Sequence, residues 1–143
     1  MDSGDAVLGL RIPPEPARAC AARRSVGAFA RAHGLAPADL DHFLTALGEA
    51  VANAIEHART SGEIAIEVRI NEARIVALVR DDGVGFPDGL AARAKLPADD
   101  AERGRGLPII RRCSDIFTLR SRPGRGTALV FGRYRSGCSQ VVA

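Results

Sequence analysis

Residues 44–58 read Leu44-Thr-Ala-Leu-Gly-Glu49-Ala-Val-Ala-Asn53-Ala-Ile-Glu-His57-Ala58, and this stretch has the clearest periodicity in the chain. Apolar residues recur every three or four positions, which predicts one amphipathic helix. Glu49, Asn53 and His57 stand four residues apart. They therefore share a second face of that helix, each about 6 Å further along the axis. The apolar face is formed by Leu44, Leu47, Val51, Ala54, Ile55 and Ala58.

The polar face of this helix has two interpretations. A solvated stripe on an ordinary amphipathic helix would show the same spacing. Asparagine, however, is a poor residue for the middle of a helix, so Asn53 calls for a reason. Its amide oxygen is a ligand type that Mg²⁺ accepts, and the carboxylate of Glu49 can take the proton of an attacking hydroxyl or water.

The remaining elements follow from the patterns on either side of this helix. It opens at Pro37 and runs to about Ala58, with an acidic first turn, and the alternation in residues 63–70 predicts a half-buried strand. Helices grouped early and antiparallel strands grouped late predict an α+β fold, a two-layer sandwich. The other expected elements are a strand over 6–12, a helix over 15–33, a strand over 73–80, a short helix at about 107–113, and strands over about 115–121 and 126–134.

The composition excludes several classes of protein. The 143 residues suit one domain, expected over residues 6–135, with 136–143 as a frayed tail. No apolar run reaches the roughly 18–20 residues of a membrane span, and the N-terminus is not built like a signal peptide, so we expect a cytoplasmic protein that binds no membrane. The basic residues form no stripe interleaved with aromatics, which argues against direct nucleic-acid binding. Three scattered cysteines are expected to be free thiols, and no zinc spacing is present.

A second motif, Asp81-Asp82-Gly83-Val84-Gly85, follows a predicted strand. Its glycines allow a sharp bend and let a ligand approach the backbone. An aspartate at the end of a strand can accept a hydrogen bond from the exocyclic amine of adenine, whereas guanine would oppose it with a carbonyl oxygen. Turns of this composition are also common without any ligand.

Two further glycine motifs follow. The run Glu102-Arg103-Gly104-Arg105-Gly106-Leu107 enters the short helix, where backbone amides attract phosphate and the two arginines can add charge. Gly126-Thr127 opens the last strand, and by itself it is only the exit from a hairpin.

Together, in this order and on these elements, the four motifs resemble the ATP-binding domain of the GHKL superfamily, which includes the gyrase, histidine kinase and MutL types. Within it, the leading Pro14-Glu-Pro-Ala-Arg18 helix start is similar to the RsbW-like anti-sigma serine/threonine kinases. The stretch 49–57 resembles the family's N-box. Asp81-x-Gly83-x-Gly85 and Gly104-Arg-Gly106-Leu107 resemble its two glycine boxes, and Gly126-Thr127 resembles the closing box. The likeness covers about residues 8 to 133 and implies a Bergerat-type fold, a mostly antiparallel sheet with helices on one face.

The resemblance also implies roles for individual residues. Glu49 would be the general base and Asn53 the Mg²⁺ ligand, with His57 either supporting the site or serving as a structural histidine. Asp81 would bind the adenine amine, helped by Thr127 directly or through water. The base would lie against the Gly83 and Gly85 turn. The phosphates would lie along the loop of Arg103, Gly104, Arg105, Gly106 and Leu107. Residues between the two glycine boxes would form the family's ATP lid.

The function implied is that of a Mg²⁺- and ATP-dependent serine/threonine protein kinase. Its protein substrate would be an anti-anti-sigma factor with a STAS domain, a second partner would be a sigma factor, and the protein would form a homodimer. Two alternatives share the same site: a nucleotide-dependent switch that binds partners without phosphorylating them, and an ATPase with no protein acceptor. No Walker A pattern and no eukaryotic-type kinase motif occurs in the sequence.

Overall fold

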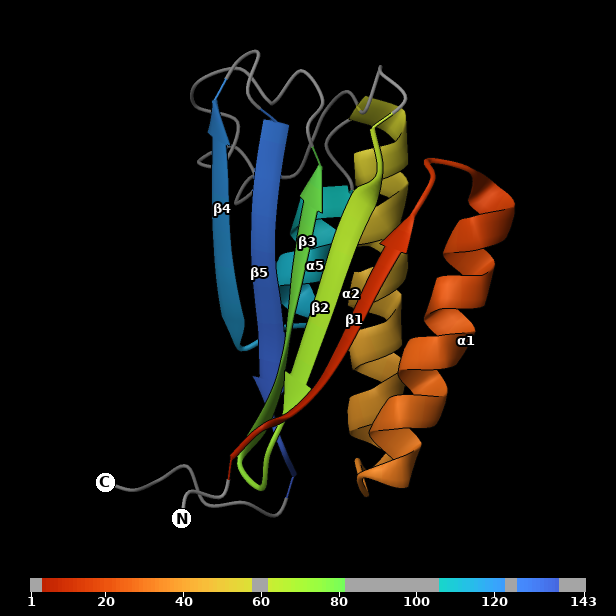
Figure 1. Cartoon of the computed structure of the whole chain (residues 1–143). Helices are drawn as coiled ribbons and strands as arrows, with labels where there is room; N and C mark the ends of the chain where they lie inside the picture. The colour runs from red at the N-terminus through yellow and green to blue at the C-terminus, as the bar shows by residue number, and fades with distance from the viewer. Residues whose placement is uncertain (1–3, 58–61, 82–105, 123–125, 137–143) are drawn as a thin grey trace.

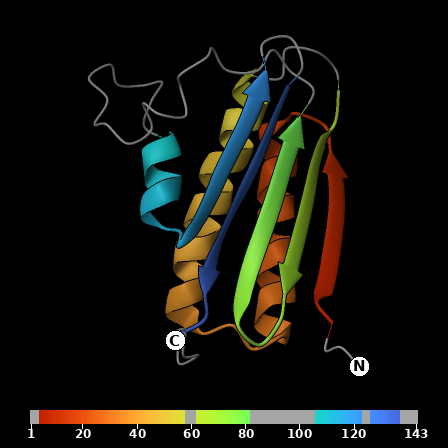
Figure 2. The same cartoon turned by 90° about the vertical axis from the view of Figure 1, so that its left-hand side faces the viewer.

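The computed structural model describes residues 4–57, 62–81, 106–122 and 126–136 of the chain. These residues form an α+β structure, a five-stranded antiparallel sheet with its helices gathered on one face (Figures 1 and 2). The expected fold class is therefore confirmed.

The observed elements agree with the sequence patterns to within one or two residues at each end. Pro37 begins α2 because its fixed φ suits the first helical position, where its missing N–H is not needed. The helices are α1 Pro16–Ala32, α2 Pro37–His57 and α5 Gly106–Arg112. The strands are β1 Ala6–Ile12, β2 Ile64–Ile70, β3 Arg74–Asp81, β4 Ile116–Arg122 and β5 Gly126–Tyr134.

The strands lie in the order β1-β2-β3-β5-β4, and every neighbouring pair is antiparallel. The order places β3 and β5 side by side inside the sheet. Their register pairs Asp81, the last residue of β3, with Thr127 near the start of β5. Two motifs that lie far apart in the sequence thus meet at one end of the sheet.

The core lies between the sheet and the helix layer. Strand β2 alternates buried and partly exposed residues, as a strand covered on one face must. Phe43 of α2 and Phe131 of β5 are both fully buried, and their ring centroids lie 5.7 Å apart across the two layers. The pair fixes α2 against the sheet, and α2 carries the predicted polar face.

Local signals explain the turns. Gly34 has a φ of 80°, the left-handed conformation that ends α1 and that glycine adopts without strain. Asn71 closes the β2–β3 turn, where its Oδ1 accepts hydrogen bonds from the backbone N–H groups of Ala73 (2.8 Å) and Arg74 (3.0 Å).

Two further expectations concern membrane spans and thiols. Within the described ranges, none of the helices is both long and apolar enough to span a bilayer. Cys20 is exposed and Cys113 partly exposed, and both are free thiols, as expected. Cys138 and the expected tail after Ser136 lie outside the described residues.

Candidate functional site

A hollow lies where the ends of β3 and β5 meet the second half of α2 and the start of α5. It is a small hollow between the described side chains. Polar side chains occupy one part of its wall and aliphatic side chains the rest, the usual make-up of a small-molecule site. The described residues that line it are Ala50, Asn53, Ala54, Val79, Asp81, Leu107, Thr127 and Leu129.

Asp81 and Thr127 form the polar part of the hollow on the sheet side. They are register partners on β3 and β5, and only 5% of Asp81 and 8% of Thr127 is accessible to solvent. A carboxylate has room to accept several hydrogen bonds. Asp81 can therefore also accept from an N–H group of a ligand in the hollow.

Asn53 faces them from α2 and is half-buried. Gly106, the first residue of α5, lies directly against its amide. A Cβ placed on Gly106 would lie 3.0 Å from both Nδ2 and Oδ1 of Asn53, closer than side chains normally approach. The absence of a side chain at Gly106 thus lets α5 come close to the amide, a reason for this glycine that the sequence alone did not supply.

Glu49 lies one helical turn before Asn53 and is half-buried. Within the described parts of the chain it takes part in no ion pair, and it is not among the residues that line the hollow. Glu49 thus stands on the same helix as Asn53, one turn away from the residues that line the hollow. His57 is the last residue of α2, and its side chain lies outside the described part of the structure.

Several predicted site residues lie outside the described ranges. These are Gly83, Gly85, Arg103, Gly104 and Arg105, so their roles stay predictions. The structure brings together Asn53, Asp81, Leu107 and Thr127, with Gly106 packed behind Asn53.

The aliphatic wall of the hollow was not predicted. Val79 and Leu129 stand two residues from Asp81 and Thr127 and face the same side of the sheet, as the two-residue period requires. Ala50 and Ala54 lie on α2 beside Asn53, where their small side chains leave room for a ligand. The signal was available in the sequence, because strand and helix periodicity place each of these residues next to a polar site residue.

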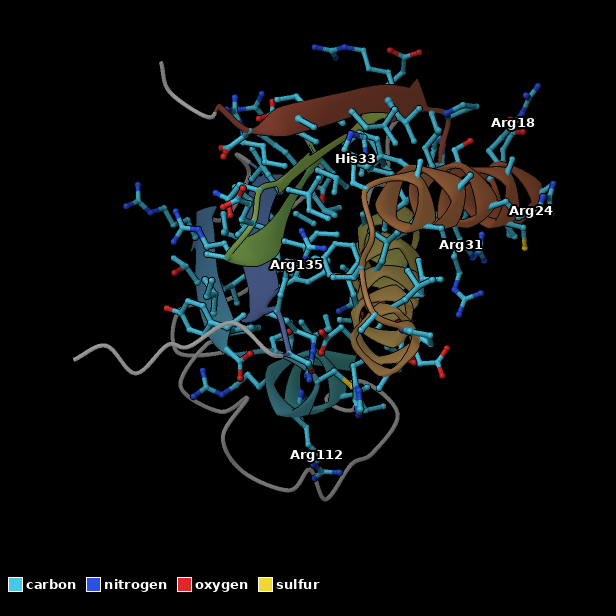
Figure 3. The ribbon with its side chains drawn as sticks, turned by 90° about the horizontal axis from the view of Figure 1, so that it is seen from below. Arg18, Arg24, Arg31, His33, Arg112 and Arg135 are labelled. Atoms are coloured by element: carbon cyan, nitrogen blue, oxygen red, sulfur yellow. The ribbon has the colours of Figure 1, made fainter. Side chains whose placement is uncertain are left out.

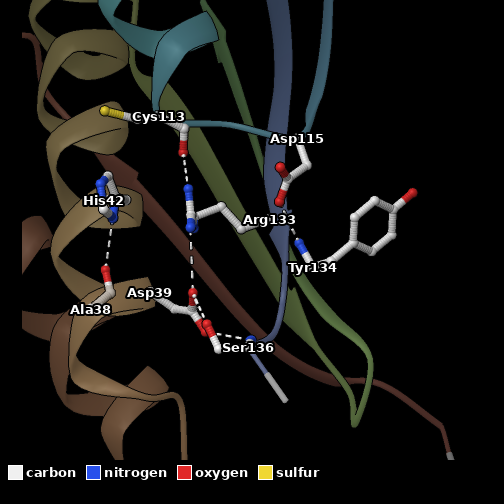
Figure 4. Close-up of polar contacts among 8 residues, drawn as sticks. All are labelled: Ala38, Asp39, His42, Cys113, Asp115, Arg133, Tyr134 and Ser136. Atoms are coloured by element: carbon white, nitrogen blue, oxygen red, sulfur yellow. Dashed lines mark hydrogen bonds and ion pairs between the residues drawn. The ribbon is translucent and has the colours of Figure 1, made fainter. Parts of the chain in front are cut away.

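A polar cluster lies at the other end of α5 (Figure 4). The Arg133 guanidinium donates to the carbonyl oxygen of Cys113, just after α5 (Nη1 to O, 3.0 Å), and contacts Asp39 in the first turn of α2 (Nη2 to Oδ1, 3.4 Å). Asp39 also accepts hydrogen bonds from Ser136, 2.7 Å from the backbone N and 2.9 Å from Oγ. Burial acts to raise the pKa of Asp39, but the hydrogen bonds from Ser136 and the charge of Arg133 outweigh it and hold that pKa below its ordinary value.

A second hollow lies at the opposite end of the sheet from the first, between the end of α1 and the β2–β3 turn. Arg135 and His33 both line it, and Figure 3 shows them in the view from below. The guanidinium of Arg135 donates to two carbonyl oxygens, those of Asn71 (2.6 Å) and His33 (3.1 Å). Arg135 thus fastens the end of β5 to two neighbouring segments.

Comparisons with known proteins place these observations in a family. Residues 12–132 match the family model described as the histidine kinase-like ATPase domain. An anti-sigma F factor of Bacillus licheniformis is 31% identical over 121 residues, which cover 80% of this chain and 83% of the relative. An anti-sigma F factor of Geobacillus stearothermophilus is 33% identical over 114 residues, or 76% of this chain and 78% of the relative.

A solved structure shows the same fold. It is a histidine kinase domain from the Erythrobacter litoralis EL346 blue-light activated histidine kinase, with a TM-score of 0.53 and 21% sequence identity. The similarity covers 68% of this chain and 45% of that protein.

Proposed function

Because the chain belongs to the histidine kinase-like ATPase domain family, we propose that it binds Mg-ATP in the hollow at the end of β3 and β5 and transfers the γ-phosphoryl group to a serine or threonine of a protein partner. The observation that carries the proposal is the buried Asp81, paired with Thr127 and facing Asn53 across a partly apolar hollow.

The adenine end of the nucleotide fits the sheet side of the hollow. Asp81 can accept a hydrogen bond from the exocyclic amine of adenine, with Thr127 beside it as a further polar partner. Guanine presents an oxygen at the same place, so two acceptors would face each other, and GTP would bind more weakly. The aliphatic side chains of Val79 and Leu129 would lie beside the base.

The phosphate end would lie toward Asn53 and Gly106. The amide oxygen of Asn53 is the kind of hard donor that Mg²⁺ accepts, and Mg²⁺ commonly takes only one or two protein ligands because water and phosphate oxygens complete its shell. Within the described ranges no cluster of three or more His, Cys, Asp or Glu residues is arranged to hold a metal. Because Gly106 has no side chain, the start of α5 packs directly against the Asn53 amide and helps to hold it in place. Bound there, the metal would neutralise phosphate charge, and the loop of Arg103, Gly104 and Arg105 would add amides and positive charge.

Glu49 would act as the general base. Its carboxylate accepts the proton of the partner's hydroxyl as that oxygen bonds to the γ-phosphorus. The bond from the γ-phosphorus to the bridging oxygen breaks, and ADP leaves with the electron pair. Phosphoryl transfer asks the protein mainly for positioning and charge neutralisation. The metal would neutralise charge, and a base one helical turn from Asn53 would take the proton.

The names of the relatives suggest the partners. Both quoted relatives are called anti-sigma F factors. We therefore propose that this chain acts in the bacterial cytoplasm as an anti-sigma factor, that it sequesters a sigma factor as a homodimer, and that its phosphorylation substrate is a STAS-domain anti-anti-sigma factor.

The test is a transfer assay with γ-labelled ATP, Mg²⁺ and the STAS-domain protein encoded nearest to this chain. Label on a serine or threonine of that protein, lost in Asn53→Ala, is the expected result. Bound ATP without transfer to any STAS partner would instead make the chain a non-catalytic switch. Release of free phosphate without labelled partner would make it an ATPase.

A further inference from the structure

Helix α5 is a short element whose position decides the shape of the nucleotide site. It has seven residues, from Gly106 to Arg112. A helix of this length has little stability of its own, so contacts at its two ends must hold it in place. Its first residue packs directly against Asn53 of α2, whereas its far end is joined to Asp39 of α2 through Arg133.

At the nucleotide end, α5 touches Asn53 and lines the hollow. Gly106 lies against the Asn53 amide with no room for a methyl group between them, and Leu107 is 96% buried in the wall of the hollow beside Asp81 and Thr127. A shift of α5 by a fraction of an ångström would therefore move both the amide of Asn53 and the wall of the site.

At the other end, Arg133 of β5 joins α5 to the beginning of α2 (Figure 4). One nitrogen of its guanidinium donates to the Cys113 carbonyl (3.0 Å), and the other contacts the Asp39 carboxylate (3.4 Å). The planar fork of arginine fixes the directions of both contacts at once, which a lysine could not do.

Asp39 is itself held rigidly. It is 99% buried, and Ser136 donates to each of its two oxygens, through the backbone N (2.7 Å) and the hydroxyl (2.9 Å). The carboxylate is thus held in place in the first turn of α2, and Arg133 spans the gap between it and the end of α5.

The geometry of the cluster suits positioning better than stabilisation. The contact between Arg133 and Asp39 is long. Among the described residues, nothing forms a hydrogen bond with the buried Nε of Arg133 or with Oγ of Ser114, the residue after Cys113. A buried ion pair with unsatisfied groups adds little net stability, and apolar residues of similar volume often replace such a pair without loss.

We propose that Arg133 is a positioning residue for the nucleotide site: by holding the Cys113 carbonyl at a set distance from Asp39, it fixes α5 so that Gly106 and Leu107 meet Asn53 and the hollow correctly. The proposal rests on nucleotide binding in that hollow and is independent of whether the phosphoryl group reaches a protein partner.

The test compares ATP affinity with stability in matched variants, using calorimetric titration of Mg-ATP and thermal unfolding of each protein. Arg133→Met should weaken ATP binding roughly 10- to 100-fold, the effect of a sub-ångström misplacement of binding groups. Arg133→Lys should recover part of the affinity because it keeps one donor. Asp39→Asn combined with Arg133→Met removes both charges and keeps a carboxamide oxygen to accept from Ser136, so it should unfold near the wild-type temperature and still bind ATP weakly.

Arg135→Met is the control, because Arg135 also joins β5 to carbonyl groups but donates to the ends of other segments, not to α5. It should lower the unfolding temperature and leave ATP affinity unchanged. The proposal is wrong if wild type binds Mg-ATP and the folded double variant binds it equally well. If wild type itself binds no ATP, the proposed function fails first.

Discussion

The contact between Gly106 and Asn53 leads to the sharpest prediction. In Gly106→Ala the new methyl group would lie 3.0 Å from both Nδ2 and Oδ1 of Asn53 and 3.3 Å from its Cγ. Non-bonded heavy atoms are comfortable at about 3.5 to 4.0 Å, so the amide must move by roughly 0.5 Å. Binding groups must be held to within about 0.5 Å of their productive positions, so a shift of this size should lower Mg-ATP affinity about tenfold, or ~1.4 kcal/mol.

The same substitution should not destabilise the protein. Gly106 is not among the described glycines with positive φ, so alanine fits its backbone. Alanine also favours helix over glycine by up to about 1 kcal/mol. The free energy of unfolding should therefore stay the same or rise, which separates loss of the site from loss of the fold.

Calorimetric titration of ATP, with Mg²⁺ and again with EDTA, measures the effect. If the Asn53 amide holds the metal, the loss should be large with Mg²⁺ and small without it. Gly27→Ala in α1 is the matched control, because its methyl group would meet only ordinary contacts at 3.5 Å and beyond. Wild-type Mg-ATP affinity in a folded Gly106→Ala protein would show that the contact with Gly106 does not position the Asn53 amide for binding.

Three further predictions follow from other parts of the structure. Asp81→Asn removes a charged acceptor, so it should weaken ATP binding by roughly 1.5 to 3 kcal/mol and reduce the preference for ATP over GTP, measured by competition. An unchanged preference would argue against an adenine contact. The pKa of Asp39 is lowered in the folded state, so its ionised carboxylate stabilises the fold, and this stabilisation is complete above the ordinary pKa of about 4. The stabilisation is lost as the pH falls through the folded-state pKa. The unfolding temperature of Asp39→Asn should therefore fall less than that of wild type between about pH 5 and pH 3, and parallel curves would contradict this. Gly132→Ala would push a methyl group into the backbone of Ile75, so it should lower the free energy of unfolding by about 1 to 3 kcal/mol, measured with denaturant. Gly9→Ala, with nothing within 4 Å of its new methyl group, should lower it by less. Equal losses would show that the close approach at Gly132 does not matter.

The local elements of the fold could be predicted because their signals are local. Alternation in 63–70 marks β2, and the helical period of 44–58 with Pro37 at its start marks α2. The residue types of the site could be proposed in the same way, since Asp81 ends a strand and Asn53 interrupts a helix.

What the sequence could not supply are the contacts between distant segments. Asp39 and Arg133 are 94 residues apart, and no local pattern connects them. The strand order, with β5 between β3 and β4, decides that Asp81 meets Thr127. The closeness of Gly106 to Asn53 depends on how α5 packs on α2, which only the tertiary structure determines.

In the proposed reaction, Glu49 acts as the base in a phosphoryl transfer from ATP held beside it. The most direct measurement is the single-turnover rate of label transfer to the STAS-domain partner at saturating Mg-ATP. Glu49→Gln is compared with Asp41→Asn, which neutralises an exposed carboxylate near the start of the same helix. Both variants should bind ATP like wild type, Asp41→Asn should transfer normally, and Glu49→Gln should be slower by on the order of 10² to 10⁴. Transfer by Glu49→Gln at the wild-type rate would contradict a role for Glu49 as the base.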